Sequence, residues 1–85
     1  MKLIFSKEAW SDYQYWKKHD PKKVERIKKL LKDIKENPFQ GIGKPEPLKL
    51  NLRGKWSRRI NSEHRLVYEI HKDRIEIGSC RYHYK

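Results

Sequence analysis

The sequence is poor in cysteine, glycine, proline and acidic residues. Its 85 residues include one cysteine, four glycines and four prolines. A single cysteine, Cys80, excludes an intrachain disulfide and a cysteine-based zinc cluster, and the four histidines show no zinc-ligand spacing. The segment Gly41-Ile42-Gly43-Lys44 lacks the spacing of a P-loop or of a dinucleotide-binding fingerprint, so we expect a loop there.

Long apolar runs are also missing. No stretch approaches the ~20 apolar residues that cross a bilayer, and residues 1–5 are too short for the core of a signal peptide. We therefore expect a soluble, cytoplasmic protein with no membrane partner. A chain of 85 residues has enough apolar surface for one small core, which predicts a single domain over residues 1–85.

Positive charge is abundant. Lysine and arginine total 22 against 11 aspartates and glutamates, which gives a formal charge of +11. Such an excess on a small protein favours a polyanionic partner, and nucleic acid is the leading class.

The first half of the sequence predicts a short strand and two helices. Residues 2–5 are β-prone, and Ser6 can cap a helix whose aromatic residues at helical spacing we expect to pack a core: Trp10, Tyr13 and Trp16. Asp20-Pro21 then starts a second helix, which ends before Asn37-Pro38. Its apolar face carries Val24, Ile27, Leu30, Leu31 and Ile34, and its basic face carries Lys22, Lys23, Arg26, Lys29 and Lys32.

The second half predicts a loop over residues 39–47 and four β-segments, at residues 48–52, 55–60, 64–70 and 74–82. Their short separations suit antiparallel hairpins. The predicted fold class is therefore α+β, with two N-terminal helices packed on a small twisted antiparallel sheet, in the order β-α-α-β-β-β-β.

Strand alternation gives an expected direction for some side chains. Leu66, Tyr68 and Ile70 share one apolar face, so Arg65 points to the other face. In the last segment a regular strand cannot direct both His83 and Tyr84 to one substrate. A bend near His83 is needed if both act together.

Basic and aromatic residues mix in the second half, which suits single-stranded RNA. The sequence also offers groups for RNA cleavage through the 2′-hydroxyl, which needs a base, an acid and a cation that stabilises the phosphorane. His83 suits the acid, Arg65 and Arg59 suit the cation, and Glu46 between two prolines suits the base. This route requires no metal and no cofactor. We read the remaining histidines as solvated residues: His19, His64 and His71.

Four motifs carry a family resemblance. They are Gly41-Ile42-Gly43-Lys44-Pro45-Glu46-Pro47-Leu48-Lys49, Trp56-Ser57-Arg58-Arg59-Ile60, Glu63-His64-Arg65-Leu66-Val67-Tyr68 and Cys80-Arg81-Tyr82-His83-Tyr84. With these motifs the chain resembles the YoeB-type toxins of the RelE superfamily, the ribosome-dependent mRNA endoribonucleases of bacterial toxin–antitoxin modules.

The resemblance implies roles for named residues. Glu46 matches the general base, His83 the general acid and Arg65 the phosphate-stabilising arginine. Lys49, Arg59 and Tyr84 match the supporting positions near the scissile phosphate or the neighbouring nucleotides. The implied reaction cuts mRNA in the ribosomal A site and leaves a 2′,3′-cyclic phosphate and a 5′-hydroxyl.

The resemblance also implies partners: mRNA and the 70S ribosome, a YefM-type antitoxin that neutralises the toxin, a second copy in a homodimer, and operator DNA only through the antitoxin complex, which represses transcription. Two alternatives stay open. One is a non-catalytic basic RNA-binding module, and the other is a protein that acts only with an antitoxin as a co-repressor.

Overall fold

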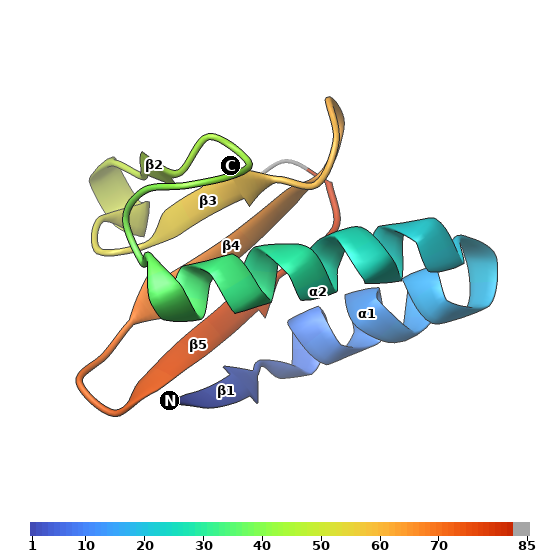
Figure 1. Cartoon of the computed structure of the whole chain (residues 1–85), viewed down its shortest axis with the longest axis horizontal. Coiled ribbons are helices and arrows are strands. Elements are labelled where there is room, and N and C mark those ends of the chain that lie inside the picture. Colours follow the sequence, from blue (N-terminus) through green and yellow to red (C-terminus); the bar gives the residue numbers. More distant parts are fainter. Residues whose placement is uncertain (83–85) are drawn as a thin grey trace.

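Two layers make up the protein. The computed structural model describes residues 1–82, and within them two helices, α1 (Lys7–His19) and α2 (Pro21–Glu36), pack on one face of a five-stranded sheet. Figure 1 shows the two helices side by side in front of the sheet. The core lies between the layers and includes Ile27, Leu66 and Ile75, each with 0% exposure. The predicted α+β class and element order are confirmed.

The sheet is mixed rather than wholly antiparallel. Its strands are β1 (Lys2–Phe5), β2 (Glu46–Pro47), β3 (Trp56–Arg59), β4 (Arg65–Ile70) and β5 (Arg74–Ser79), in the spatial order β1-β5-β4-β3-β2. Strands β3 to β5 pair antiparallel as predicted. Strand β2 lies at the end of the predicted loop over residues 39–47 and pairs antiparallel with β3, whereas β1 pairs parallel with β5. Parallel neighbours need a long crossover between them, and here both helices and three strands intervene.

Local signals in the sequence explain both helices. The Ser6 Oγ accepts a hydrogen bond from the Ala9 N–H at 3.0 Å and caps α1. At the start of α2 the Asp20 carboxylate contacts Lys23 Nζ at 2.8 Å instead of capping a backbone N–H, and Pro21 occupies the first turn. The five residues predicted for the apolar face of α2 are all buried.

The aromatic residues of α1 divide into two groups. Trp16 is buried and Tyr13 packs against the core, as predicted. Trp10 is 52% exposed, so the prediction of a core role is wrong for this ring. It stacks on Tyr13, with a centroid distance of 5.9 Å, and meets the edge of Phe5. Because a helical turn has 3.6 residues, a repeat of three residues does not keep side chains in line. Trp10 is therefore rotated away from the buried face that carries Trp16.

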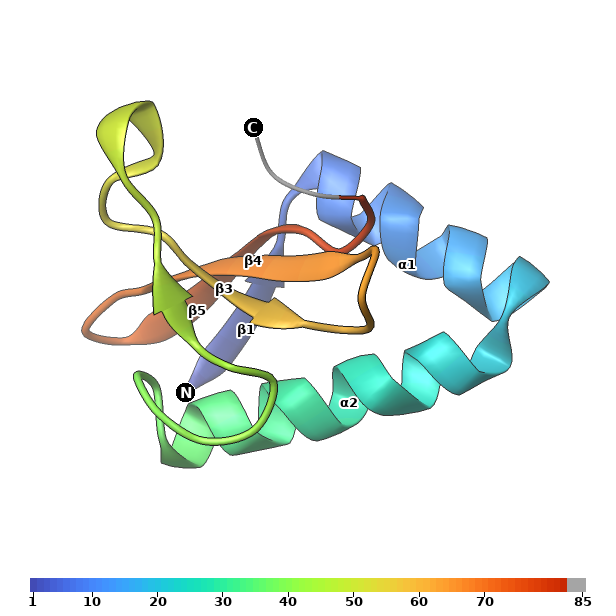
Figure 2. The same cartoon turned by 90° about the horizontal axis from the view of Figure 1, so that it is seen from above.

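The predicted strand over residues 48–52 is also wrong. Strand β2 ends at Pro47, and Leu50–Leu52 form a 3₁₀ turn, η1. Leu50 has a φ of 58°, which a strand does not permit, and the Lys55 N–H donates to the Leu52 carbonyl at 3.1 Å. The chain therefore turns back at once to form β3 (Figure 2). The alternating leucines, Leu48, Leu50 and Leu52, lie in the connection between β2 and β3.

Candidate functional site

The register of three neighbouring strands brings candidate residues to one face of the sheet. Glu46 of β2 lies opposite Ser57 of β3, and Ser57 lies opposite Val67 of β4. Directly paired residues share a face, as do residues two apart along a strand. Glu46, Arg59 and Arg65 are therefore on the same face, and Leu66 and Tyr68, which pack in the core, are on the other. The predicted direction of Arg65 agrees with this register.

Arg65 is held in place by the turn that precedes β4. Its Nη1 donates to the carbonyl of Asn61 at 2.9 Å and to those of Ser62 and His64 at 3.2 Å. The residue is only 8% exposed. Among the described residues these side-chain hydrogen bonds use Nη1, and a guanidinium has five N–H donors in all. Nε and Nη2 are thus suited to bind a phosphate with little further ordering of the side chain.

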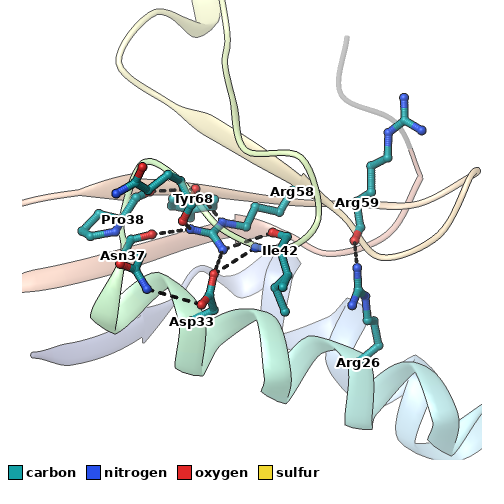
Figure 3. Close-up of polar contacts among 9 residues, drawn as sticks. Arg26, Asp33, Asn37, Pro38, Ile42, Arg58, Arg59 and Tyr68 are labelled. Atoms are coloured by element: carbon teal, nitrogen blue, oxygen red, sulfur yellow. Dashed lines mark hydrogen bonds and ion pairs between the residues drawn. The ribbon is translucent and has the colours of Figure 1, made fainter.

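Arg59 is the cross-strand partner of Arg65. Two like charges directly opposite each other destabilise a sheet. Arg59 is exposed, and its side chain extends away from the helices (Figure 3). An anion placed between the two guanidinium groups would relieve their repulsion, so this end of the sheet is a candidate anion-binding site.

Glu46 and Lys49 border the same region from the β2 side. Both are exposed, and they line an open groove of about 340 Å³ that runs along residues 46–52. The N–H of Arg59 donates to the Gly43 carbonyl at 2.7 Å, which ties the loop before β2 to β3. This hydrogen bond helps to fix the position of the Glu46 backbone relative to Arg59 and Arg65.

Arg58, by contrast, has a structural role that the sequence did not reveal. It is 0% exposed and points to the opposite face, toward the end of α2. Its guanidinium contacts the Asp33 carboxylate and the Asn37 carbonyl, and its Nε donates to the Tyr68 hydroxyl at 3.1 Å (Figure 3). The Arg58 hydrogen bond holds the pKa of Asp33 below its ordinary value. Arg58 is therefore unavailable for RNA.

The last described residues leave the sheet earlier than predicted. Strand β5 ends at Ser79 instead of reaching residue 82. The Cys80 N–H donates to the Asp12 carboxylate at 3.0 Å, and the Trp16 indole N–H donates to the Cys80 carbonyl at 2.8 Å. Side chains of α1, rather than the backbone of a neighbouring strand, thus form these hydrogen bonds with the Cys80 backbone. His83 and Tyr84, two of the candidate site residues, lie outside the described residues.

His64 is a buried residue, and its reading as a solvated histidine is wrong. It is 7% exposed, its ring meets the Trp16 ring edge-on with centroids 4.7 Å apart, and its Nδ1 accepts a hydrogen bond from the Tyr82 N–H at 2.7 Å. Burial, followed by nearby cations, holds its pKa below the ordinary value. Strand alternation contained the signal, since residue 64 shares the apolar face of Leu66.

One group of potential metal ligands lies at the β4–β5 hairpin. Among residues 1–82, ligand atoms of Glu69, His71 and Glu76 lie within 4.8 Å of one another. The His71 Nε2 is 3.5 Å from Glu69 and 3.3 Å from Glu76, and Arg74 Nε donates to Glu76 at 2.8 Å. The ion pair with Arg74 accounts for the position of the Glu76 carboxylate. Within the described residues no helix is long and apolar enough to cross a membrane.

Comparison with known proteins decides the family. Residues 5–84 match the model of the YoeB-like toxins of bacterial type II toxin–antitoxin systems. The chain belongs to this family. It is 57% identical to the toxin YoeB of Escherichia coli strain K12 over 84 residues, which cover 99% of this chain and 100% of that protein.

Solved YoeB structures share the fold. The YoeB dimer from Staphylococcus aureus superposes with a TM-score of 0.94 at 52% identity, and the YoeB–YefM complex from the same organism superposes with a TM-score of 0.92 at 50% identity. Each comparison covers 99% of this chain and 98% of the other. The two-layer architecture is thus that of YoeB toxins.

Proposed function

We propose that this protein is a ribosome-dependent endoribonuclease toxin that cleaves mRNA in the ribosomal A site and so inhibits translation. The observation that carries the proposal is the shared face of Glu46, Arg59 and Arg65 on adjacent strands. This face joins an acidic group to two cations, one of them held in place by three carbonyls. Membership of the YoeB family adds independent support.

The proposed reaction uses the RNA's own 2′-hydroxyl as the nucleophile. Glu46 accepts the 2′-hydroxyl proton as the oxygen attacks the adjacent phosphorus. Arg65 stabilises the charge of the phosphorane. His83 gives a proton to the departing 5′-oxygen, so the P–O5′ bond breaks as the P–O2′ bond forms. The products are a 2′,3′-cyclic phosphate and a 5′-hydroxyl, and neither a metal ion nor a cofactor takes part.

The supporting residues act on binding and orientation. Arg59 opposite Arg65 binds the scissile or a neighbouring phosphate. Lys49 at the start of η1 binds the backbone of the message, and Tyr84 supports the reacting nucleotide. These contacts fix the phosphate within reach of the base and the acid, which is the part of catalysis supplied by positioning.

The relatives support two of the proposed partners, the antitoxin and a second copy of the chain. A YefM-type antitoxin neutralises the protein, because a relative of 50% identity is solved as a YoeB–YefM complex. A homodimer is proposed on the same basis from the Staphylococcus aureus dimer. The ribosome brings the mRNA, operator DNA is contacted only through the antitoxin complex, and the site of action is the cytoplasm.

Cleavage by purified protein on translating ribosomes tests the proposal. We expect mRNA cutting in the ribosomal A site, and we expect Glu46→Gln and His83→Gln each to reduce the cleavage rate by about 10²–10⁴-fold with ribosome binding retained. Lys72→Gln, on the turn between β4 and β5, serves as the matched control that removes a charge elsewhere. Ribosome binding without cutting by the unaltered protein would instead favour the non-catalytic RNA-binding module.

A further inference from the structure

The backbone of Tyr82 has an unfavourable conformation. Its φ is 62°, in the left-handed region that residues other than glycine rarely adopt. Its N–H donates to Nδ1 of His64 at 2.7 Å, and its carbonyl accepts from the N–H of Arg65 at 3.0 Å. Two hydrogen bonds on one residue therefore fix the backbone of Tyr82, which directly precedes His83 in the sequence.

The bond from Tyr82 depends on the protonation state of His64. A neutral imidazole has one N–H donor and one acceptor nitrogen, whereas an imidazolium has two donors and no acceptor. Since Nδ1 accepts the Tyr82 N–H, the proton of the neutral ring is on Nε2. Protonation of Nδ1 would replace this hydrogen bond by two opposed N–H groups.

The surroundings of His64 favour its neutral form. The pKa of His64 is lowered, chiefly by burial and then by three cations, while Glu63, whose Oε1 is 3.7 Å from Nε2, acts in the opposite direction. Asp12 also interacts with His64 through its charge. The groups around the ring therefore come from every neighbouring element: Asp12 and Trp16 of α1, Lys23 of α2, Glu63 of the preceding turn, Arg65 of β4, and Arg81 and Tyr82 after β5.

We propose that neutral His64 is a positioning residue, whose Nδ1 anchors the amide of Tyr82, the residue before His83 in the sequence, and that addition of a proton to His64 releases this anchor. The effect on cleavage rests on the function proposed above, whereas the anchor itself does not. His64 touches no reacting atom in this scheme. It acts through the backbone that carries the proposed acid.

Three substitutions separate the acceptor from the packing. His64→Asn keeps an acceptor oxygen near the position of Nδ1 and does not titrate. His64→Leu keeps an apolar side chain against Trp16 but has no acceptor. His19→Leu, at the exposed end of α1, removes a histidine that makes no contact with this segment in the hydrogen bonds described for residues 1–82.

Amide hydrogen exchange of Tyr82, measured by NMR as a protection factor, tests the anchor without any assay of activity. In the unaltered protein we expect protection to fall as the pH decreases and His64 takes up a proton. His64→Leu should lower protection by about tenfold at neutral pH, which corresponds to one lost hydrogen bond. His64→Asn should retain protection and lose its dependence on pH, and His19→Leu should behave like the unaltered protein.

Cleavage on ribosomes tests the consequence. His64→Leu should lower kcat by about tenfold with little change in KM, and His64→Asn should restore most of the rate and weaken the decline of kcat in mildly acidic buffer. Unchanged Tyr82 protection in His64→Leu would overturn the inference, as would equal losses in the Asn and Leu variants. If His64→Leu does not fold, the pH titration of Tyr82 in the unaltered protein still decides the question. Normal anchoring without any RNA cleavage would refute the proposed function instead.

Discussion

At the scale of single residues, position relative to the sheet separates arginines that look equivalent in the sequence. Arg58 and Arg59 are adjacent, but one is fully buried beside Asp33 and the other is exposed on the opposite face. Arg65 is buried but lies on the same face of the sheet as the exposed Arg59. Alternation predicts that neighbours in a strand face opposite sides of the sheet. It does not identify the carboxylate that pairs with the buried Arg58, because Asp33 lies 25 residues away in the chain.

Replacement of Arg58 should therefore affect folding, and replacement of Arg59 should affect function. We expect Arg58→Met to lower the free energy of unfolding by about 3–5 kcal/mol, because a fully buried guanidinium is lost from its ion pair with the half-buried Asp33 and from its hydrogen bonds to Tyr68 and Asn37. Arg59→Met should leave stability almost unchanged and weaken RNA cleavage. Urea denaturation and the ribosome assay measure the two effects, and equal destabilisation by both variants would contradict the assigned roles.

At the scale of secondary-structure elements, local signals predicted both helices and strand β1 well, but they predicted neither the pairing of β1 nor the turn at residues 50–52. Ser6, Pro21 and the apolar repeat of α2 act over a few residues, so both helices follow from the sequence. The pairing of β1 with β5 joins residues about 70 positions apart, and no local pattern encodes it. Residues 48–52 alternate like a strand, but the positive φ of Leu50 turns the chain into η1.

The candidate site shows the same division. Glu46, Arg59 and Arg65 could be proposed from residue chemistry and from the family resemblance, and the strand register then brings them to one face. The anchor at His64 was missed because its partner is a backbone N–H beyond the end of β5. A contact of this kind depends on where a strand stops, which alternation alone does not give.

The loop before β2 contains a glycine that close packing requires. Gly43 has a φ of 80°, and an added Cβ would lie 2.8 Å from Leu30 Cδ2 and 3.2 Å from the Arg59 carbonyl oxygen. We expect Gly43→Ala to reduce the free energy of unfolding by about 1–3 kcal/mol and to displace β2, with a loss of cleavage.

Gly78→Ala is the matched control for this loop. Its Cβ would meet the Val67 carbonyl oxygen at 3.7 Å, an ordinary contact, so stability should change by less than about 0.5 kcal/mol. Chemical denaturation of both variants is the measurement. Similar stabilities for the two alanine variants would show that the loop does not require glycine at position 43.

At the scale of the whole molecule, charge is distributed over both layers. The formal charge is +11, and exposed cations lie on α2 as well as on and beside the sheet: Lys22, Lys29, Lys32, Lys49 and Arg59. A protein with this distribution can contact several phosphate groups at once. Composition alone predicted a polyanionic partner, and the structure assigns particular cations to the two surfaces.

Stability of the whole protein should depend on pH through His64. Its pKa is lowered on folding, so the unfolded chain binds the proton more readily than the native protein does. The stabilising contribution is therefore complete above the ordinary histidine pKa of about 6.5 and is lost as the pH falls through the lower native value. Urea denaturation from pH 8 to pH 5 should show a steeper loss for the unaltered protein than for His64→Asn, and identical slopes would contradict this assignment.

The ends of the cut RNA test most directly whether protein side chains move the protons of a 2′-hydroxyl attack. Ribosome-bound mRNA cleaved by the protein should carry a 2′,3′-cyclic phosphate on the upstream fragment and a 5′-hydroxyl on the downstream fragment, and Glu46→Gln and His83→Gln should yield little of either. Fragments that end in a 3′-hydroxyl and a 5′-phosphate, or unchanged yields of the cyclic phosphate in both variants, would contradict the proposed chemistry.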